Sequence, residues 1–162
     1  MSETASHTLG PREALQYYHS RTVILPKSVT ALEGWNMVMA KPLPLMATAF
    51  RIRDAISARF GVKKISGFSG KRADSVQVGD KLDFFLVEHI DPNLLVMTER
   101  DTHLDVMTTI STEGQEFTVT SSVITHNWFG RLYMVPVGIA HRVIVAAMLR
   151  RLKTSMEDHT RS

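Results

Sequence analysis

The stretch that decides the fold is residues 127–153, which read NWFGRLYMVPVGIAHRVIVAAMLRRLK. From Pro136 onward it predicts a helix, because proline is well tolerated in a first helical turn. On a wheel of about 3.6 residues per turn, Arg142 and Lys153 point away from an apolar stripe. The predicted stripe consists of Val137, Ala140, Ile144, Ala147 and Met148. The rest of the chain must supply a surface that covers this stripe.

His141 falls within the apolar stripe, beside Val145 and Leu152. A buried imidazole is most often held by a hydrogen-bonded backbone or carboxylate partner, which favours a structural role. The alternative is a histidine at a cavity wall, poised to bind or protonate a ligand. Arg142 lies about 100° further round the helix and is expected to face solvent.

The bulk composition is that of one ordinary globular domain. The chain has 162 residues, of which 44% are hydrophobic and 22% charged. This length is enough to bury a core without disulfide or metal support. We predict a disordered tail over residues 1–13, a single domain over residues 14–156 and a frayed end over residues 157–162.

Charge and cysteine content exclude several classes of function. The net charge of +3 is spread along the chain, so no nucleic-acid surface is expected. The absence of cysteine excludes disulfides, thiolate catalysis and cysteine-ligated zinc. The start MSETASHTLG lacks the pattern of a signal peptide. His141 and Arg142 interrupt the apolar run of residues 132–149, which argues against a membrane span. We therefore expect a cytoplasmic protein.

Upstream, the sequence predicts one strand and two helices. Residues 17–25 are rich in aromatic and β-branched side chains, which indicates a strand. Ser28 is a typical N-cap for a helix over residues 29–41, and prolines separate that helix from a second over residues 45–60. The second helix is predicted to bury Leu45, Ala49, Ile52, Ile56 and Phe60, and to expose Arg51, Arg53, Asp54 and Arg59.

Four further strands are predicted between these helices and the last one. They cover residues 81–90, 94–99, 103–111 and 116–126, with turn residues between them. Short turns between β-rich segments indicate an antiparallel meander. The predicted fold class is therefore α+β: a curved antiparallel sheet of one N-terminal strand and a four-strand meander, wrapped on a long C-terminal helix, with a bent pair of shorter helices.

This order of elements resembles the START-like helix-grip architecture. The sequence is also similar to a bacterial family called domain of unknown function twenty-eight sixty-seven. The motifs that carry this resemblance are Asp101-Thr102-His103-Leu104-Asp105, Gly130-Arg131-Leu132-Tyr133, Pro136 and His141-Arg142. Some members of that family are fused to a Rossmann domain, so the resemblance implies a Rossmann-type protein as a possible partner. It implies no activity and no cofactor.

Asp101, His103 and Asp105 are the first candidate site. In one continuous strand they would share a face and could bind a metal or perform acid–base chemistry. Because Arg100 to Thr102 has the composition of a turn, the hairpin alternative is favoured, with Asp101 capping the turn through its side chain. No second pair of ligands supports a metal, and none is predicted.

Three functions stay open at this point. The first is a domain that binds a small apolar or amphipathic molecule between the sheet and the C-terminal helix. The second is a protein-interaction domain, without a ligand, that presents the sheet or the helix around Trp35 to a protein partner. The third, to which we give least weight, is an enzyme that uses His141 with Asp101, His103 or Asp105. The residues expected to contact a ligand are Tyr133, His141, Arg131, Met107 and Phe117.

Overall fold

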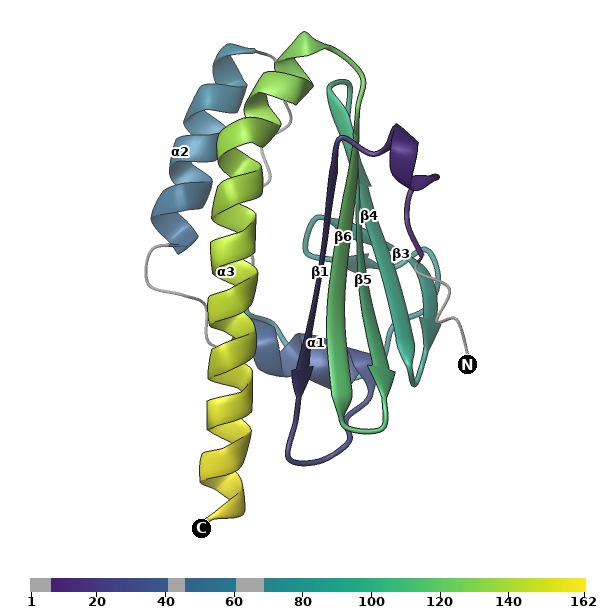
Figure 1. The fold of residues 1–162 in the computed structure, drawn as a ribbon, viewed down its shortest axis with the longest axis vertical. Helices are drawn as coiled ribbons and strands as arrows, with labels where there is room; N and C mark the ends of the chain where they lie inside the picture. The colour runs from purple at the N-terminus through teal and green to yellow at the C-terminus, as the bar shows by residue number, and fades with distance from the viewer. Residues whose placement is uncertain (1–6, 41–45, 61–68) are drawn as a thin grey trace.

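The computed structural model describes residues 7–40, 46–60 and 69–162, without the side chains of residues 47–49. It shows the predicted α+β fold, in which one antiparallel sheet is covered by helices (Figure 1). In chain order the elements are the 3-10 turn η1 (Arg12–Ala14), β1 (Tyr17–Ile24), α1 (Ala31–Ala40), α2 (Met46–Arg59), β2 (Lys81–Leu82), β3 (Phe85–Asp91), β4 (Leu94–Arg100), β5 (Leu104–Glu113), β6 (Glu116–Thr125) and α3 (Trp128–Thr160).

The sheet confirms the predicted meander. Its strand order is β1-β6-β5-β4-β3-β2, and all the pairings are antiparallel. The prediction of one strand over residues 81–90 was wrong, because a two-residue turn at Asp83 and Phe84 divides it into β2 and β3. Asp83 has a φ of 54°, a conformation that two-residue hairpins require and aspartate tolerates. β1 closes the opposite edge by pairing along its whole length with β6.

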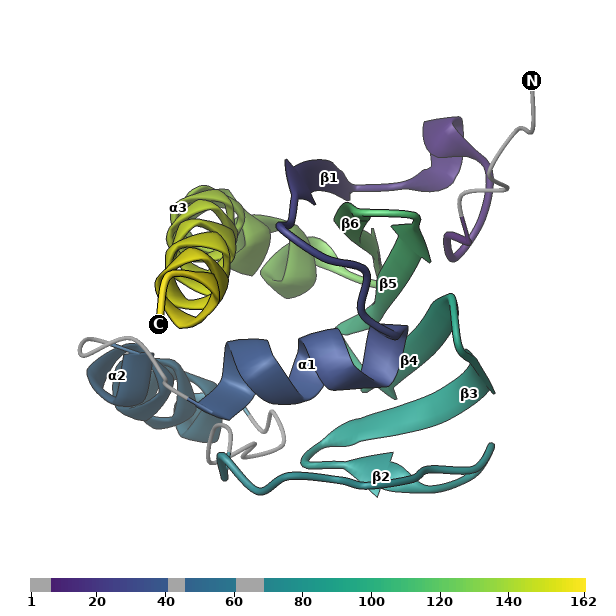
Figure 2. The same ribbon diagram turned by 90° about the horizontal axis from the view of Figure 1, so that it is seen from below.

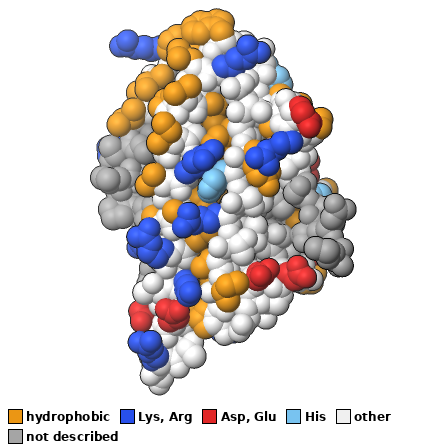
Figure 3. Space-filling view, in the orientation of Figure 1, with side chains coloured by type: hydrophobic (Ala, Val, Ile, Leu, Met, Phe, Trp, Pro, Cys, Tyr) orange, Lys and Arg blue, Asp and Glu red, His pale blue; other side chains and the backbone are white. Residues whose placement is uncertain are grey.

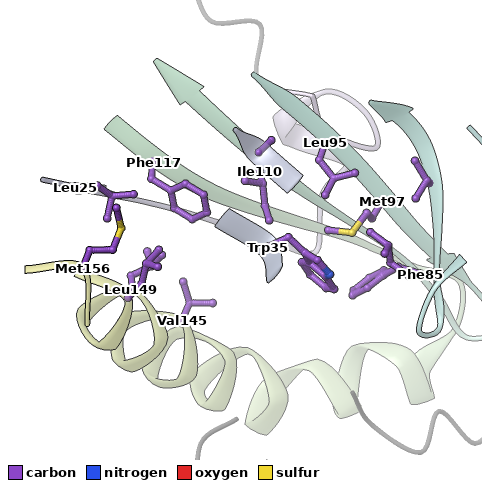
Figure 4. Close-up of a cluster of buried hydrophobic side chains, with 14 residues drawn as sticks. Leu25, Trp35, Phe85, Leu95, Met97, Ile110, Phe117, Val145, Leu149 and Met156 are labelled. Atoms are coloured by element: carbon purple, nitrogen blue, oxygen red, sulfur yellow. The ribbon is translucent and has the colours of Figure 1, made fainter. Parts of the chain in front are cut away.

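The core lies between the sheet and the helices α1 and α3. Figure 2 shows both helices on the same side of the sheet. Trp35 of α1 is 3% exposed and packs edge-on against Phe85, with the ring centroids 6.1 Å apart. The other large side chains of this core, several of which are labelled in Figure 4, are Leu25, Leu95, Met97, Ile110, Phe117, Val145, Leu149, Leu152 and Met156.

α3 is longer than predicted and buries a different side. It begins at Trp128, where the side chain of Asn127 caps it by accepting a hydrogen bond from the Gly130 N–H at 2.9 Å. Pro136 therefore lies inside the helix rather than at its start. The predicted stripe was wrong: Ala140 is exposed, and Val137, Ile144, Ala147 and Met148 are only half-buried. The buried residues are Phe129, Gly130, Met134, Gly138, Val145, Leu149, Leu152 and Met156.

The reason is that apolar residues occur all round the first half of α3. Periodicity alone then permits more than one buried side, and tertiary packing selects among them. Arg142 is exposed as predicted, whereas Lys153 is half-buried. The predicted contacts of His141 with Val145 and Leu152 place it near the side that is in fact buried.

The two shorter helices also differ from their predictions. The cap of α1 is Thr30 rather than Ser28: Thr30 and Glu33 form a capping box, with bonds of 2.9 and 3.1 Å between backbone N–H and side-chain oxygen. In α2 the predicted buried side was wrong, as far as the structure describes it. Ile52, Ile56 and Phe60 are 56%, 47% and 48% exposed. Leu45 and the side chain of Ala49 lie outside the described residues.

The side of α2 that faces inward carries Met46 and Ser57, which are 6% and 0% exposed, together with Arg53 and Asp54. Arg53 donates from Nε to Tyr133 Oη at 2.9 Å and pairs with Asp54 at 2.9 Å. The side chains of Arg53 and Asp54 are only 16% and 11% exposed. Arg51 and Arg59 are exposed, as predicted. The polar contact with α3 thus satisfies the Arg53 side chain in this orientation of α2.

Residues 7–14 cover part of the other face of the sheet. Thr109 donates from Oγ1 to the His7 carbonyl at 3.1 Å, and the Leu9 N–H donates to Ser122 Oγ at 3.3 Å. Arg12 stacks over the Tyr18 ring, with Cζ 3.7 Å from the centroid.

Candidate functional site

An open groove lies on the α3 side between the edge strand β1 and α3, with a volume of about 450 Å³. Tyr17, the first residue of β1, forms one wall. The other wall consists of two rows of α3 residues at intervals of four, which lie one above another on a helix. The rows are Met134, Gly138 and Arg142, and Val135, Ile139 and Val143. The groove is thus apolar except for Tyr17 and one arginine.

Gly138 allows α3 to approach Tyr17 this closely. A Cβ atom at this position would lie 3.0 Å from two carbons of the Tyr17 ring. Tyr17 donates from Oη to the Gly138 carbonyl at 3.3 Å, and its ring packs with Val123 and Met134. The wall that β1 contributes is therefore fixed by both packing and hydrogen bonding.

His141 lies behind this wall and braces it. Its Nδ1 is 3.0 Å from Tyr17 Oη, and its Nε2 is 3.2 Å from Ser121 Oγ. Burial lowers the pKa of His141 to about 4, and the charges of His19 and Arg142 act in the same direction. The ring is therefore neutral at pH 7 and both of its nitrogens are hydrogen-bonded.

Strand register explains how these groups meet. Tyr17 and His19 lie on one face of β1, and His19 pairs directly with Ser121 of β6. Ser121 is 2% exposed, and its Oγ also lies 3.3 Å from Thr108 Oγ1. Neither Ser121 nor His141 is among the residues that line the groove. The serine–histidine pair therefore holds Tyr17 in place and does not have the geometry of an accessible nucleophile and base.

His19 adds an unsatisfied polar atom beside this cluster. Its ring meets the His141 ring edge-on at 5.9 Å, and its buried Nδ1 has no hydrogen-bond partner among the described residues. Burial lowers the pKa of His19, and the charges of Arg142 and Arg21 lower it further. Buried polar atoms are normally paired, so this nitrogen is a position for a further hydrogen bond.

Arg142 is the cation of the groove. Its Cζ lies 5.5 Å from the centroid of the Tyr17 ring. Burial raises the pKa of Tyr17, and the hydrogen bond and charge of Arg142 offset part of that rise, so the phenol is protonated at neutral pH. Within the described part of the chain, Arg142 forms no ion pair with a carboxylate. Its charge is thus available to an anion in the groove.

The Asp101–Asp105 motif lies elsewhere and confirms the hairpin alternative. Asp101 precedes β5 and accepts hydrogen bonds from the N–H groups of His103 at 2.7 Å and Leu104 at 3.0 Å. The His103 ring lies 2.8 Å from the Asn127 side chain, and Asp105 pairs with His126 at 3.1 Å. Among the described residues, no three histidine or acidic side chains gather as a metal site would require.

Comparison with known proteins gives the family. The family described as "Protein of unknown function (DUF2867)" matches residues 12–148. The chain belongs to this family. The match confirms the resemblance predicted from the sequence motifs and extends into α3. Its START-like and bacterial aspects stay predictions.

Two other comparisons add little to this family assignment. No curated protein matches the chain. Among solved structures, the chain is similar to the hypothetical protein jhp0584 from Helicobacter pylori, with a TM-score of 0.43 and 14% identity over 94% of this chain and 98% of that chain.

The residues predicted to contact a ligand are not brought together in this DUF2867 chain. Phe117 is fully buried in the core, whereas Met107 pairs with Ser122 on the opposite face of the sheet. Arg131 is exposed, and Tyr133 is held by Arg53. His141 lies next to the groove without lining it.

None of the residues predicted to contact a ligand lines the groove. The missed residues are Tyr17, Met134, Val135, Gly138, Ile139, Arg142 and Val143. The spacing of four on α3 was a readable signal, since it places Met134, Gly138 and Arg142 in one row. No signal in the sequence indicated the pairing of β1 with β6, which brings Tyr17 beside that row.

Proposed function

We propose that this domain binds a small amphipathic anion, of the chemical class of fatty acids, in the groove between β1 and α3. The apolar part of the ligand lies along Met134, Val135, Ile139 and Val143, and its acidic group pairs with Arg142. The observation that carries the proposal is a cation without a described carboxylate partner in an otherwise apolar groove. Its volume of about 450 Å³ suits a small molecule.

The neighbouring groups have defined roles in this proposal. Tyr17 supplies a protonated phenol at the wall, and His141 holds it through the 3.0 Å contact between Nδ1 and Oη. Ser121 fixes the other ring nitrogen of His141 at 3.2 Å. A preformed wall limits the ordering cost of binding. Apolar contact adds about 0.8 kcal/mol for each buried methylene, so affinity should rise with chain length.

The test is displacement of a fluorescent fatty acid by unlabelled saturated acids and by alcohols of the same chain length. Arg142→Gln should weaken the binding of the acids by about tenfold, because a hydrogen bond to a charged group contributes about 1.5–3 kcal/mol. The same substitution should leave the affinity for the alcohols unchanged. Arg150→Gln, an exposed position on the same helix outside the groove, is the matched control. Equal losses for acids and alcohols, or for both variants, would contradict the proposal.

The two alternatives have less support. An exposed apolar face on Trp35, Met37 and Met39 would have favoured the interaction hypothesis. Met37 is 36% exposed, but Trp35 is 3% exposed and Met39 is half-buried, so these residues form no continuous exposed face. The enzyme hypothesis required acid–base groups in one cavity, but Asp101 caps a turn and both nitrogens of His141 are occupied. A Rossmann-type partner and a cytoplasmic location stay predictions.

A further inference from the structure

The solvent side of α3 carries a continuous apolar stripe. Intervals of four, three, four and four residues keep its members on one side of the helix. Each member is between 62% and 68% exposed: Trp128, Leu132, Val135, Ile139 and Val143. Val135, Ile139 and Val143 also line the groove, whereas Trp128 and Leu132 belong to this stripe alone. Monomeric soluble proteins rarely expose a long apolar row of this kind without a partner surface.

α2 widens this stripe into a face. Figures 1 and 2 show α2 beside the first half of α3, and the Phe60 and Phe129 rings lie 4.5 Å apart. The exposed side chains of Ile52, Ile56 and Phe60 therefore extend the apolar surface. We call these three residues, together with the five of the α3 stripe, the helix face. In Figure 3, hydrophobic side chains gather over α2 and the first half of α3.

The charge around the helix face has one sign. The α2 segment contains one acidic residue, Asp54, which is 11% exposed and paired with Arg53. α3 has no acidic residue before Glu157. The exposed cations on these two helices include Arg51, Arg59, Arg131, Arg142 and Arg150. In Figure 3 the basic side chains lie among the hydrophobic ones, and the acidic side chains lie toward the right and the lower part of the view.

The combination of exposed apolar side chains and positive charge indicates which kind of partner fits the helix face. A second copy of the chain on the same face would bring arginines against arginines, which like-charge repulsion disfavours. A lipid surface with acidic headgroups satisfies both features, because apolar side chains enter the acyl boundary while arginines pair with phosphates. An indole at one end, Trp128, is typical of side chains at the membrane interface.

α3 is long and apolar enough, by length and composition, to cross a membrane, and 22% of its most apolar window is buried in the fold. Its other side, however, supplies Val145, Leu149 and Leu152 to the core. Crossing would remove these side chains from the sheet, whereas lying on the surface would leave them in place. We infer that the helix face docks the folded domain on the surface of an anionic phospholipid membrane.

The test uses the two tryptophans of the chain. Trp35 is 3% exposed and Trp128 is 68% exposed, so Trp35→Phe leaves Trp128 as the reporter. Adding vesicles with about one third phosphatidylglycerol should shift its emission to the blue, and brominated lipids should quench it. Vesicles of phosphatidylcholine alone should bind at least about tenfold more weakly. Equal binding to both vesicle types, or to neither, would overturn the inference.

Leu132→Glu is the decisive variant, and Val78→Glu is its control. The two side chains are 62% and 66% exposed, and Val78 lies in the loop before β2. Vesicle sedimentation should fall at least about tenfold for Leu132→Glu and stay unchanged for Val78→Glu. Leu132 does not line the groove, so fatty-acid displacement should survive this variant and separate this inference from the proposed function. A vesicle-free dimer in sedimentation velocity that Leu132→Glu dissociates would instead assign the face to a second copy.

Discussion

Replacing His141 by phenylalanine tests how the wall of the groove is held. The change keeps a flat ring but removes both nitrogens, which lie 3.0 Å from Tyr17 Oη and 3.2 Å from Ser121 Oγ. Each partner keeps a second contact at 3.3 Å, from Tyr17 to the Gly138 carbonyl and between Ser121 and Thr108. The free energy of unfolding at pH 7 should therefore fall by about 1–2 kcal/mol, the lower part of the range for a lost buried partner.

The pH dependence gives a sharper result. Folding lowers the pKa of His141 from its ordinary 6.5 to about 4, mainly through burial. Between these values the unfolded chain binds more protons, so the stability that neutral His141 confers is complete above about pH 6.5 and is lost as pH falls toward 4. The full difference is about 3 kcal/mol. His141→Phe lacks this acid-induced loss of stability, so the stability curves of the two proteins should cross at about pH 5.5.

Urea denaturation followed by circular dichroism, repeated from pH 7 to pH 4.5, measures both curves. His19 also has a lowered pKa, but it is present in both proteins and its effect largely cancels. His159→Phe, an exposed position near the end of α3, is the control and should run parallel to the natural protein. Parallel curves for His141→Phe would refute a buried, neutral imidazole at this position.

Three further stability predictions use the same denaturation assay. Leu149→Ala should lower the free energy of unfolding by about 2–5 kcal/mol, because Leu149 is 2% exposed. Ile144→Ala should lower it clearly less, because Ile144 is half-buried. The reverse order would support the buried stripe that was predicted from the sequence. Gly138→Ala should destabilise by about 1 kcal/mol net, since contact with the fixed Tyr17 ring outweighs the helix propensity gained, and a stabilised variant would contradict that close approach. Asp101→Ala should cost about 1–2 kcal/mol through its two lost turn bonds, and an unchanged midpoint would deny them.

The sequence predicted the sheet well because its signals are local. Turn residues at Pro92-Asn93 and Gly114-Gln115 lie between the strands they separate, and Gly114 has a φ of 59°. The hairpin role of Asp101 was readable for the same reason. The division at Asp83 was missed because an aspartate followed by phenylalanine is a weaker turn signal than a glycine.

The orientation of the helices was not readable. α2 exposes Ile56, and its half-buried Arg53 donates a hydrogen bond to a tyrosine on α3, which is a contact between segments distant in sequence. α3 has apolar residues on several sides, so its buried side depends on which strand lies beneath it. The groove follows from both facts, since it needs Tyr17 of β1 against the Gly138 row of α3.

If an amphipathic anion binds in the groove between β1 and α3, as we propose, the side chains of the groove should respond to it. Methyl-resolved NMR during titration with dodecanoate tests this proposal most directly, because the groove and the core have different methyl groups. Binding in the groove should give saturable shifts at Val135, Ile139 and Val143, and small shifts at Leu95 and Ile110 of the core. Shifts centred on the core methyls, or none at the three groove residues, would contradict it.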